Sequence, residues 1–274
     1  MAVDLHTHTT ASDGSLSPSE LVREAARAGV RVLAITDHDS TDGLAEALAE
    51  ARRHPPLELV PGIELNTEAD RFEIHILGYF IDWEVGWFQE VLRGFREERR
   101  GRVHRMAERL AALGIPIDPE EVFALVREGS AGRPHVAQVM VQHGYVGSVG
   151  EAFDRYLKHG GPAYVSYQKL PPEEAIALIR RAGGVPVLAH PGFIDQDDLI
   201  PRLARAGLGG VECYYAAHTP AQIATFLRLT RELGLVATGG SDYHGPRVTP
   251  DGRVGTPRVP YEVYQTLLAA PRGA

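Results

Sequence analysis

The stretch VDLHTHTTASDGS, residues 3–15, decides how the rest of this 274-residue chain is organised. A short apolar run leads into His6 and His8, which flank Thr7. In an extended backbone, residues i and i+2 point to the same side, so the two imidazoles can converge on one metal ion. Asp13, in the polar loop that follows, adds a carboxylate nearby. A pair of histidines alone is a common surface feature, so this prediction depends on matching ligands elsewhere in the chain.

The composition, with 44% hydrophobic and 23% charged residues, is typical of a globular protein with a large core. A formal net charge of -8 argues against broad binding of nucleic-acid backbone, and we expect no duplex DNA partner. The single cysteine, Cys213, excludes a disulfide framework and a thiolate zinc site, so histidines and carboxylates must hold any metal. The beginning of the chain does not resemble a signal peptide, and no apolar run is long enough to span a bilayer. We therefore expect a cytoplasmic protein without a membrane partner or an obligate protein partner.

Short apolar runs alternate with helical patterns along most of the chain. The run at residues 30–36 is typical of a strand buried on both faces, and Ser17 with Pro18 and Glu20 marks a helix start. Seven strand candidates separated mainly by helices predict a parallel sheet, because parallel strands need crossovers of that length. Such a sheet closes into a barrel or stays open, and in both forms the ligand site lies at the carboxyl ends of the strands. The strands are predicted at residues 3–8, 30–36, 57–63, 72–81, 185–189, 210–214 and 235–238.

Residues 85–160 interrupt this alternation with a helical and charged segment. The Gly160-Gly161-Pro162 turn signal closes it. We interpret residues 85–160 as an inserted helical cap subdomain and residues 1–84 with 161–274 as the main domain. The basic run REERRGR within the insertion is typical of a solvated helix face, and we expect no nucleic-acid contact there.

Nine potential metal ligands lie at or next to the predicted strand ends. Burying so many of these groups together without a metal would leave unsatisfied or mutually repelling polar atoms, which is costly. Nine ligands also exceed what one ion of zinc-like coordination needs, so at least two ions are expected, and three if a carboxylate bridges. The nine are His6, His8, Asp13, His38, Glu64, His75, His190, Asp242 and His244.

Seven motifs in this order resemble those of the polymerase and histidinol phosphatase (PHP) superfamily. The whole chain resembles its stand-alone TrpH/YciV-like branch of metal-dependent phosphoesterases. The motifs are HTHTTASDGS, ITDHDSTDG, GIELN, EIHILGYFID, VLAHP, GVECYY and GGSDYHG.

The resemblance implies a distorted seven-stranded (β/α)7 barrel with a trinuclear metal centre. It implies that Glu64 bridges two ions and that a metal-bound water, held by Glu64, Asp242 and His190, acts on the substrate. One ion would lie between His6, His8, Glu64 and Asp242, a second between Glu64, His75 and His190, and a third between Asp13, His38 and His244. Oxygen ligands suit Mn²⁺ and Fe²⁺ and imidazoles suit Zn²⁺. We expect two to three divalent ions, Mn²⁺ or Fe²⁺, with Zn²⁺ as the alternative.

Four residues are predicted to contact substrate. Arg133 and His135, in the GRPH segment at the start of an inserted helix, suit capture of a phosphate. Lys158 would add to a cationic rim, and His218 would face the site or cap the helix that it precedes.

Three acidic residues beside the ligands have two interpretations each. Asp37 and Asp39 flank His38 and would either orient imidazoles or cap the turn after the strand. Glu212 would either support a ligand or form a salt bridge.

The chemistry that such a centre performs is hydrolysis of a phosphate ester by a metal-activated water. No glycine-rich phosphate loop, nucleophile elbow or Cys/His pair competes with this prediction. The substrate would be a phosphorylated small molecule or a short oligonucleotide. The resemblance implies removal of the 3′-phosphate from nucleoside 3′,5′-bisphosphates such as pAp, or 5′ to 3′ trimming of short RNA. The alternatives are a histidinol-phosphate phosphatase and a non-catalytic metal-binding module.

Overall fold

Seven strands form one sheet in which each strand pairs with its neighbour in the sequence, from β1 to β7. The computed structural model describes residues 2–69, 72–126, 131–166, 170–194 and 198–272. The predicted strands and helices are confirmed to within a few residues, except that β3 continues past Glu64. The strands are β1 (Ala2–Asp4), β2 (Val30–Ile35), β3 (Glu58–Ala69), β4 (Phe72–Tyr79), β5 (Val185–Leu188), β6 (Gly210–Tyr215) and β7 (Val236–Gly240).

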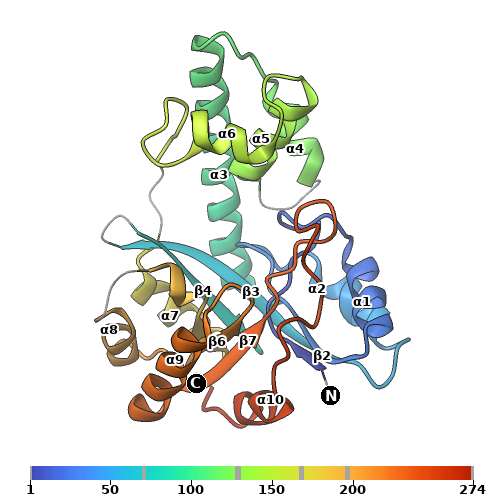
Figure 1. The fold of residues 1–274 in the computed structure, drawn as a ribbon, viewed down its shortest axis with the longest axis vertical. Coiled ribbons are helices and arrows are strands. Elements are labelled where there is room, and N and C mark those ends of the chain that lie inside the picture. The colour runs from blue at the N-terminus through green and yellow to red at the C-terminus, as the bar shows by residue number, and fades with distance from the viewer. Residues whose placement is uncertain (1, 70–71, 127–130, 167–169, 195–197, 273–274) are drawn as a thin grey trace.

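Helices surround the sheet on the sides and at one end (Figure 1). The predicted helix start at Ser17 is confirmed, because Ser17 and Glu20 cap each other reciprocally. The helices of the main domain are α1 (Pro18–Arg27), α2 (Leu44–Ala51), α7 (Pro172–Arg181), α8 (Leu199–Arg205), α9 (Pro220–Leu233) and α10 (Tyr261–Leu268), with the 3-10 turn η2 (Pro191–Phe193) after β5.

The sheet closes on itself where β1 meets β7. The backbone N–H of Leu5 donates to the carbonyl of Gly239 at 3.2 Å, and that of Asp242 donates to the carbonyl of His6 at 2.9 Å. Gly240 permits this approach, because a Cβ built on it would lie 2.4 Å from the Cβ of His6. The distorted seven-stranded barrel is therefore confirmed.

The prediction of a purely parallel sheet was wrong at β4, which runs antiparallel to both β3 and β5. Only residues 70–71 separate Ala69 from Phe72, which is too short for a crossover between parallel strands. Because β4 is reversed, His75 near its amino end lies at the same edge as the carboxyl ends of the other strands, opposite Asn66. The sequence therefore predicted the correct edge for His75 but the wrong strand direction.

The lower part of the barrel is filled by apolar side chains and sealed by α10. Val3, Val32, Val60 and Val187 belong to one buried cluster, and Leu267 of α10 packs into it. The hydroxyl of the buried Tyr79 donates to the carbonyl of Leu5 at 2.9 Å. A packed lower end leaves the opposite end of the barrel for polar groups.

The segment predicted as a cap lies above the barrel in Figure 1. The first half of α3 packs on the barrel through Phe88 and Leu92, and its second half packs with the remaining helices in a separate apolar cluster. That cluster also includes Val165, beyond the predicted boundary at residue 160, and the division into two domains stays a prediction. The helices are α3 (Gly86–Ala112), α4 (Pro119–Val126), α5 (Arg133–Gln142), α6 (Val149–Ala152) and the π-helix η1 (Phe153–Leu157).

None of the helices in the described ranges is both long and apolar enough to cross a membrane. The longest of them, α3, carries seven arginines.

We predict that Gly240→Ala destabilises the barrel by about 1–3 kcal/mol, the usual cost of overpacking, because its methyl group would overlap His6. Thermal unfolding measures the change. Gly94→Ala on α3 is the matched control, since a Cβ there meets nothing within 4 Å, and it should be neutral or stabilising. Equal melting temperatures for the two variants would contradict the closure of the barrel at Gly240.

Candidate metal centre

The nine ligands predicted from the strand ends lie together in the structure. Three overlapping groups have ligand atoms that all lie within 4.8 Å of one another. His8, His38 and Glu64 each belong to two of the groups. The groups are His8, Asp13, His38 and His244; His6, His8, Glu64 and Asp242; and His38, Glu64 and His75.

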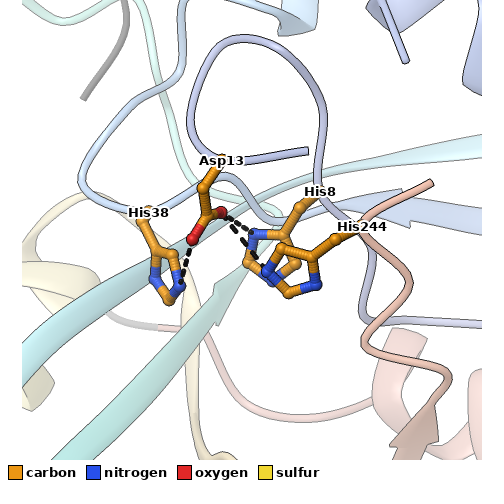
Figure 2. Close-up of side chains that lie close together, drawn as sticks. All are labelled: His8, Asp13, His38 and His244. Carbon is orange, nitrogen blue, oxygen red and sulfur yellow. Dashed lines mark ion pairs between the residues drawn. The ribbon is translucent and has the colours of Figure 1, made fainter. Parts of the chain in front are cut away.

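Figure 2 shows the first group, in which three imidazoles surround Asp13. Oδ1 of Asp13 lies 3.3 Å from His244 Nε2 and 3.8 Å from His8 Nδ1, and Oδ2 lies 3.8 Å from His38 Nε2. The sequence had placed His8 in a different group from Asp13. In the structure, His8 belongs both to the group that contains Asp13 and to the group that contains His6.

Glu64 lies at the middle of the centre, with a side chain that is 1% exposed. Its Oε2 lies 3.2 Å from one nitrogen each of His6, His8 and His38. Its Oε1 lies 2.9 Å from His75 Nδ1 and 3.2 Å from His190 Nε2. Burial opposes ionisation of Glu64, but the nearby imidazoles, with His38 the strongest, hold the pKa of its carboxyl well below its usual range. A carboxylate that offers both oxygens to opposite sides can bridge two cations.

The predicted role of His190 has partial geometric support. His190 contacts Glu64, yet within the described ranges it joins none of the three groups. The backbone of His190 has a positive φ of 28°, and Asp242 and Asp39 also have positive φ angles, at 52° and 49°. Non-glycine residues held in this region are strained, and such strain clusters at functional sites.

The chemistry of the donor set fits divalent cations. Burial alone would lower the pKa of the His8 imidazole, but the carboxylates of Asp242 and Glu64 raise this pKa to about 10. Nδ1 of His8 and Oδ1 of Asp13 are buried without a hydrogen bond to any described residue. Bound metal ions replace protons at such ligands and satisfy lone pairs that are otherwise unpaired. Imidazoles and carboxylates in these numbers are the ligands that such ions use.

Glu212 supports the centre from a fully buried position on β6. One of its oxygens accepts a hydrogen bond from His6 Nδ1 at 3.0 Å, and the other accepts the backbone N–H of His190 at 2.8 Å. The first contact directs His6 Nε2 toward Glu64 and Asp242. The interpretation of Glu212 as a support for ligands is the one that these contacts favour.

Asp4 fixes the junction between β1 and β7 beneath the same ligands. Its carboxylate accepts hydrogen bonds from the backbone of His6, Ser241 and Gly255 and from the hydroxyl of Ser241. Complete burial raises the pKa of Asp4 to about 6, although these four hydrogen bonds lower it in part. Asp4 was not among the residues predicted from the sequence, although its position two residues before His6, inside an apolar run, was an available signal.

Asp37 fixes a loop, whereas Asp39 acts on the imidazole of His38 through Asn66. Asp37 accepts hydrogen bonds from Thr9 and from the hydroxyl of Ser12, and so fixes the loop that carries Asp13. Asp39 accepts the backbone N–H of Asn66 at 3.0 Å, and the amide of Asn66 contacts His38 Nδ1 at 3.0 Å.

The expectation that REERRGR is a solvated face was wrong for two of its arginines. Arg99 and Arg102 are 7% and 4% exposed and line a cavity over the centre. Arg99 forms an ion pair with Asp39, so α3 is joined to the β2 end. Their spacing of three residues places them on one helix face, but it does not show that this face is buried.

This cavity has a volume of about 180 Å³ and joins the barrel to the cap. On the barrel side it reaches Asp13, His38 and His75 of the metal centre. On the cap side it is lined by Arg99, Arg102, Gly132, Arg133, Pro134, His135 and Phe153.

The four predicted substrate residues have different surroundings. Arg133 lines the cavity and its Nη2 contacts both oxygens of Glu73 at 2.8 Å. His135 also lines it, and its Nδ1 accepts the backbone N–H of Gly132 at 3.1 Å. Lys158 is exposed and pairs with Asp154 at 3.6 Å, away from the residues that line the cavity. His218 is buried and bonded to backbone atoms, which leaves its predicted contact with substrate without geometric support.

The sequence profile of the PHP domain matches residues 4–164. The chain is 37% identical to the 5′-3′ exoribonuclease Rnm of Escherichia coli K12, over 89% of this chain and 85% of the relative. It is 36% identical to the 3′,5′-nucleoside bisphosphate phosphatase of Chromobacterium violaceum, over 89% of this chain and 87% of the relative.

A solved structure of a metal-dependent phosphoesterase described as putative, from Bifidobacterium adolescentis, superposes with a TM-score of 0.87. It is 30% identical, and the match covers 97% of this chain and 95% of that one. The superposition therefore includes the segment predicted as a cap as well as the barrel, because it covers nearly all of both chains.

We predict that Glu212→Gln lowers metal affinity by about 10- to 100-fold, the usual effect of losing a partner behind a ligand. The amide keeps the size of the side chain but has only one acceptor oxygen, so it can no longer accept from both His6 and the backbone of His190. Titration of the purified protein with Mn²⁺, followed by metal analysis, measures the effect. Unchanged affinity with unchanged fold would contradict the supporting role.

We predict that His8→Ala removes both metal and activity, because His8 lies in two of the three ligand groups. Metal content per chain should fall by at least one ion, while the far-ultraviolet circular dichroism spectrum stays that of the native protein. His104→Ala in α3 is the control for loss of a histidine elsewhere. Full metal content in His8→Ala would exclude His8 as a ligand.

Proposed function

The chain belongs to the PHP domain family, and from this premise we propose that its nine ligands hold two to three divalent cations with which it hydrolyses phosphate esters of nucleotides. The proposal rests on a cavity that is lined both by residues of the ligand cluster and by arginines of the cap. A phosphate monoester or diester needs cations around the phosphoryl oxygens; the arginines supply them from the cap side, and the proposed metal ions would supply them from the barrel side.

Bound divalent ions would supply positive charge to the phosphoryl oxygens and a nucleophilic water of lowered pKa. Glu64, Asp242 and His190 are the proposed residues around that water. Arg99 and Arg102 are buried at the cavity wall and would orient the phosphate from the cap side. Arg133 would hold a more distant group of the substrate. No side chain is proposed as a covalent nucleophile.

The proposed metals are Mn²⁺ or Fe²⁺, with Zn²⁺ as the alternative. Three carboxylates and six imidazoles form a mixed set of oxygen and nitrogen donors. Such a set suits Mn²⁺ and Fe²⁺ as well as Zn²⁺, and activity with each metal restored to the metal-free protein decides between them.

The proposed substrates are nucleoside 3′,5′-bisphosphates and short RNA. The two relatives above are named for these two activities and are similar to this chain to nearly the same degree. Phosphate release from pAp and from short 5′-phosphorylated RNA, assayed with one preparation, separates them. Hydrolysis of histidinol phosphate but of neither nucleotide would overturn the proposal, and a protein that retains metal without hydrolysing any of these substrates would indicate the non-catalytic alternative.

We predict that Arg133→Ala raises KM for a nucleoside bisphosphate by about 10- to 100-fold, the range expected for loss of a charge-assisted hydrogen bond. Hydrolysis of a simple aryl phosphate, which lacks the second phosphate, should change much less. A substrate phosphate would take the place that the Glu73 carboxylate occupies on Nη2.

Arg228→Ala is the matched control, because Arg228 forms a comparable ion pair with Glu232 on the exposed surface of α9. It should leave both substrates unaffected. Equal losses on the two substrates in Arg133→Ala would show that Arg133 has a structural role instead of binding the second phosphate.

A further inference from the structure

Phe193 presents an exposed aromatic ring beside the metal centre. Its side chain is 64% exposed, the largest fraction among the exposed large hydrophobic side chains of the described residues. An exposed aromatic ring costs free energy in water, and single cases on a surface need no explanation. The surroundings of Phe193 distinguish it from such cases.

The turn that carries Phe193 is anchored through both backbone polar groups of Gly192. The N–H of Gly192 donates to His218 Nε2 at 3.1 Å, and Gln222 Nε2 donates to the carbonyl of Gly192 at 3.2 Å. His218 is itself held by the carbonyl of Cys213 at 3.0 Å. A Cβ on Gly192 would lie 2.5 Å from the His218 ring, so the turn packs tightly on this support. Phe193 therefore projects from a turn that is held in place at the preceding residue.

The ring of Phe193 lies directly beside one proposed metal ligand, His190, and is linked to a second, Asp242, through Tyr215. Its centroid lies 5.9 Å from that of His190 and 5.8 Å from that of Tyr215, in an edge-to-face arrangement with the tyrosine. The hydroxyl of Tyr215 donates to Asp242 Oδ2 at 3.0 Å. A group that stacks on Phe193 would thus lie next to a phosphate at the centre.

Phe193 also lines a second cavity, of about 290 Å³, that shares Arg133 with the first. Phe72 and Tyr164 add two more aromatic rings. The cavity is lined by Glu68, Phe72, Glu73, Arg133, His159, Tyr164 and Phe193.

The aromatic rings of this second cavity decide what it can hold. Phe72, Tyr164 and Phe193 line it from three separate segments of the chain. A flat ring is favourable there, because its faces can stack on these aromatic rings.

We propose that Phe193 is the stacking platform for a nucleobase, and that the second cavity takes the base of the nucleotide whose phosphate is hydrolysed. This inference rests on the proposed function and specifies its substrates. Stacking accepts every base, so discrimination between bases is weak. A paired base cannot reach the platform, so the substrate is a free nucleotide or an unpaired strand.

The first test compares a nucleotide with glycerol phosphate, which has no ring. Phe193→Ala should lower kcat/KM for the nucleotide by about 5- to 150-fold, the measured range for loss of one base stack. The loss on glycerol phosphate should be much smaller, and Phe193→Trp should restore nucleotide hydrolysis. Leu268→Ala, which removes an exposed apolar side chain on α10, is the control and should change neither substrate. Equal losses on both substrates in Phe193→Ala, or none on either, would overturn the inference.

The second test separates stacking from catalysis. Tryptophan fluorescence of Phe193→Trp should be quenched by adenosine monophosphate, and that of the unmodified protein much less. Quenching in a protein that hydrolyses no phosphate ester would support base stacking at Phe193 and contradict the proposed function. Hydrolysis of nucleotides without quenching would support the proposed function and contradict base stacking at Phe193.

Discussion

The structure depends on one buried carboxylate that faces five imidazoles. Glu64 is 1% exposed, and nitrogens of His6, His8, His38, His75 and His190 lie within 3.2 Å of its two oxygens. Burying a charge is costly unless it is compensated, and these imidazoles would repel each other if all took up protons. Divalent cations held by Glu64 and the imidazoles would satisfy both sets of groups. Five segments of the chain must converge for this to happen, and the barrel is the arrangement that brings them together.

A polar network beneath the ligands maintains that arrangement. Asp4, Asp37 and Glu212 are almost completely buried, and each accepts hydrogen bonds that fix a ligand or the loop that carries one. Networks of this kind rigidify a site when every member is satisfied. The positive φ angles at His190 and Asp242 are held within the same framework. Strained backbone and buried carboxylates at one end of the barrel therefore lower the stability of the fold, and the apolar packing at the other end offsets this cost.

The segment predicted as a cap brings arginines to the cavity over the predicted metal centre, and in the proposed function these arginines would select the substrate. Arg99 and Arg102 reach the cavity from α3, and Arg133 reaches it from α5. The ion pair between Arg99 and Asp39 joins the cap to the barrel directly at the site. In the neighbouring cavity, which shares Arg133, the exposed ring of Phe193 offers a surface for a flat ring. Cations for phosphate and an aromatic surface for a base are together what a nucleotide substrate requires.

The sequence by itself predicted nine ligands and the edge of the sheet where the structure brings their side chains together, because apolar runs and turn residues are local signals and the ends of neighbouring strands share an edge. It also determined the helices, whose caps and spacing are local. Only the tertiary structure decided the reversal of β4, which groups His8 joins, and that Arg99 and Arg102 turn inward from a charged helix. It also decided that His218 supports a turn and that Phe193 stands exposed on that turn. These features depend on contacts between segments far apart in the chain, and burial and partners of that kind leave no periodic trace in the sequence.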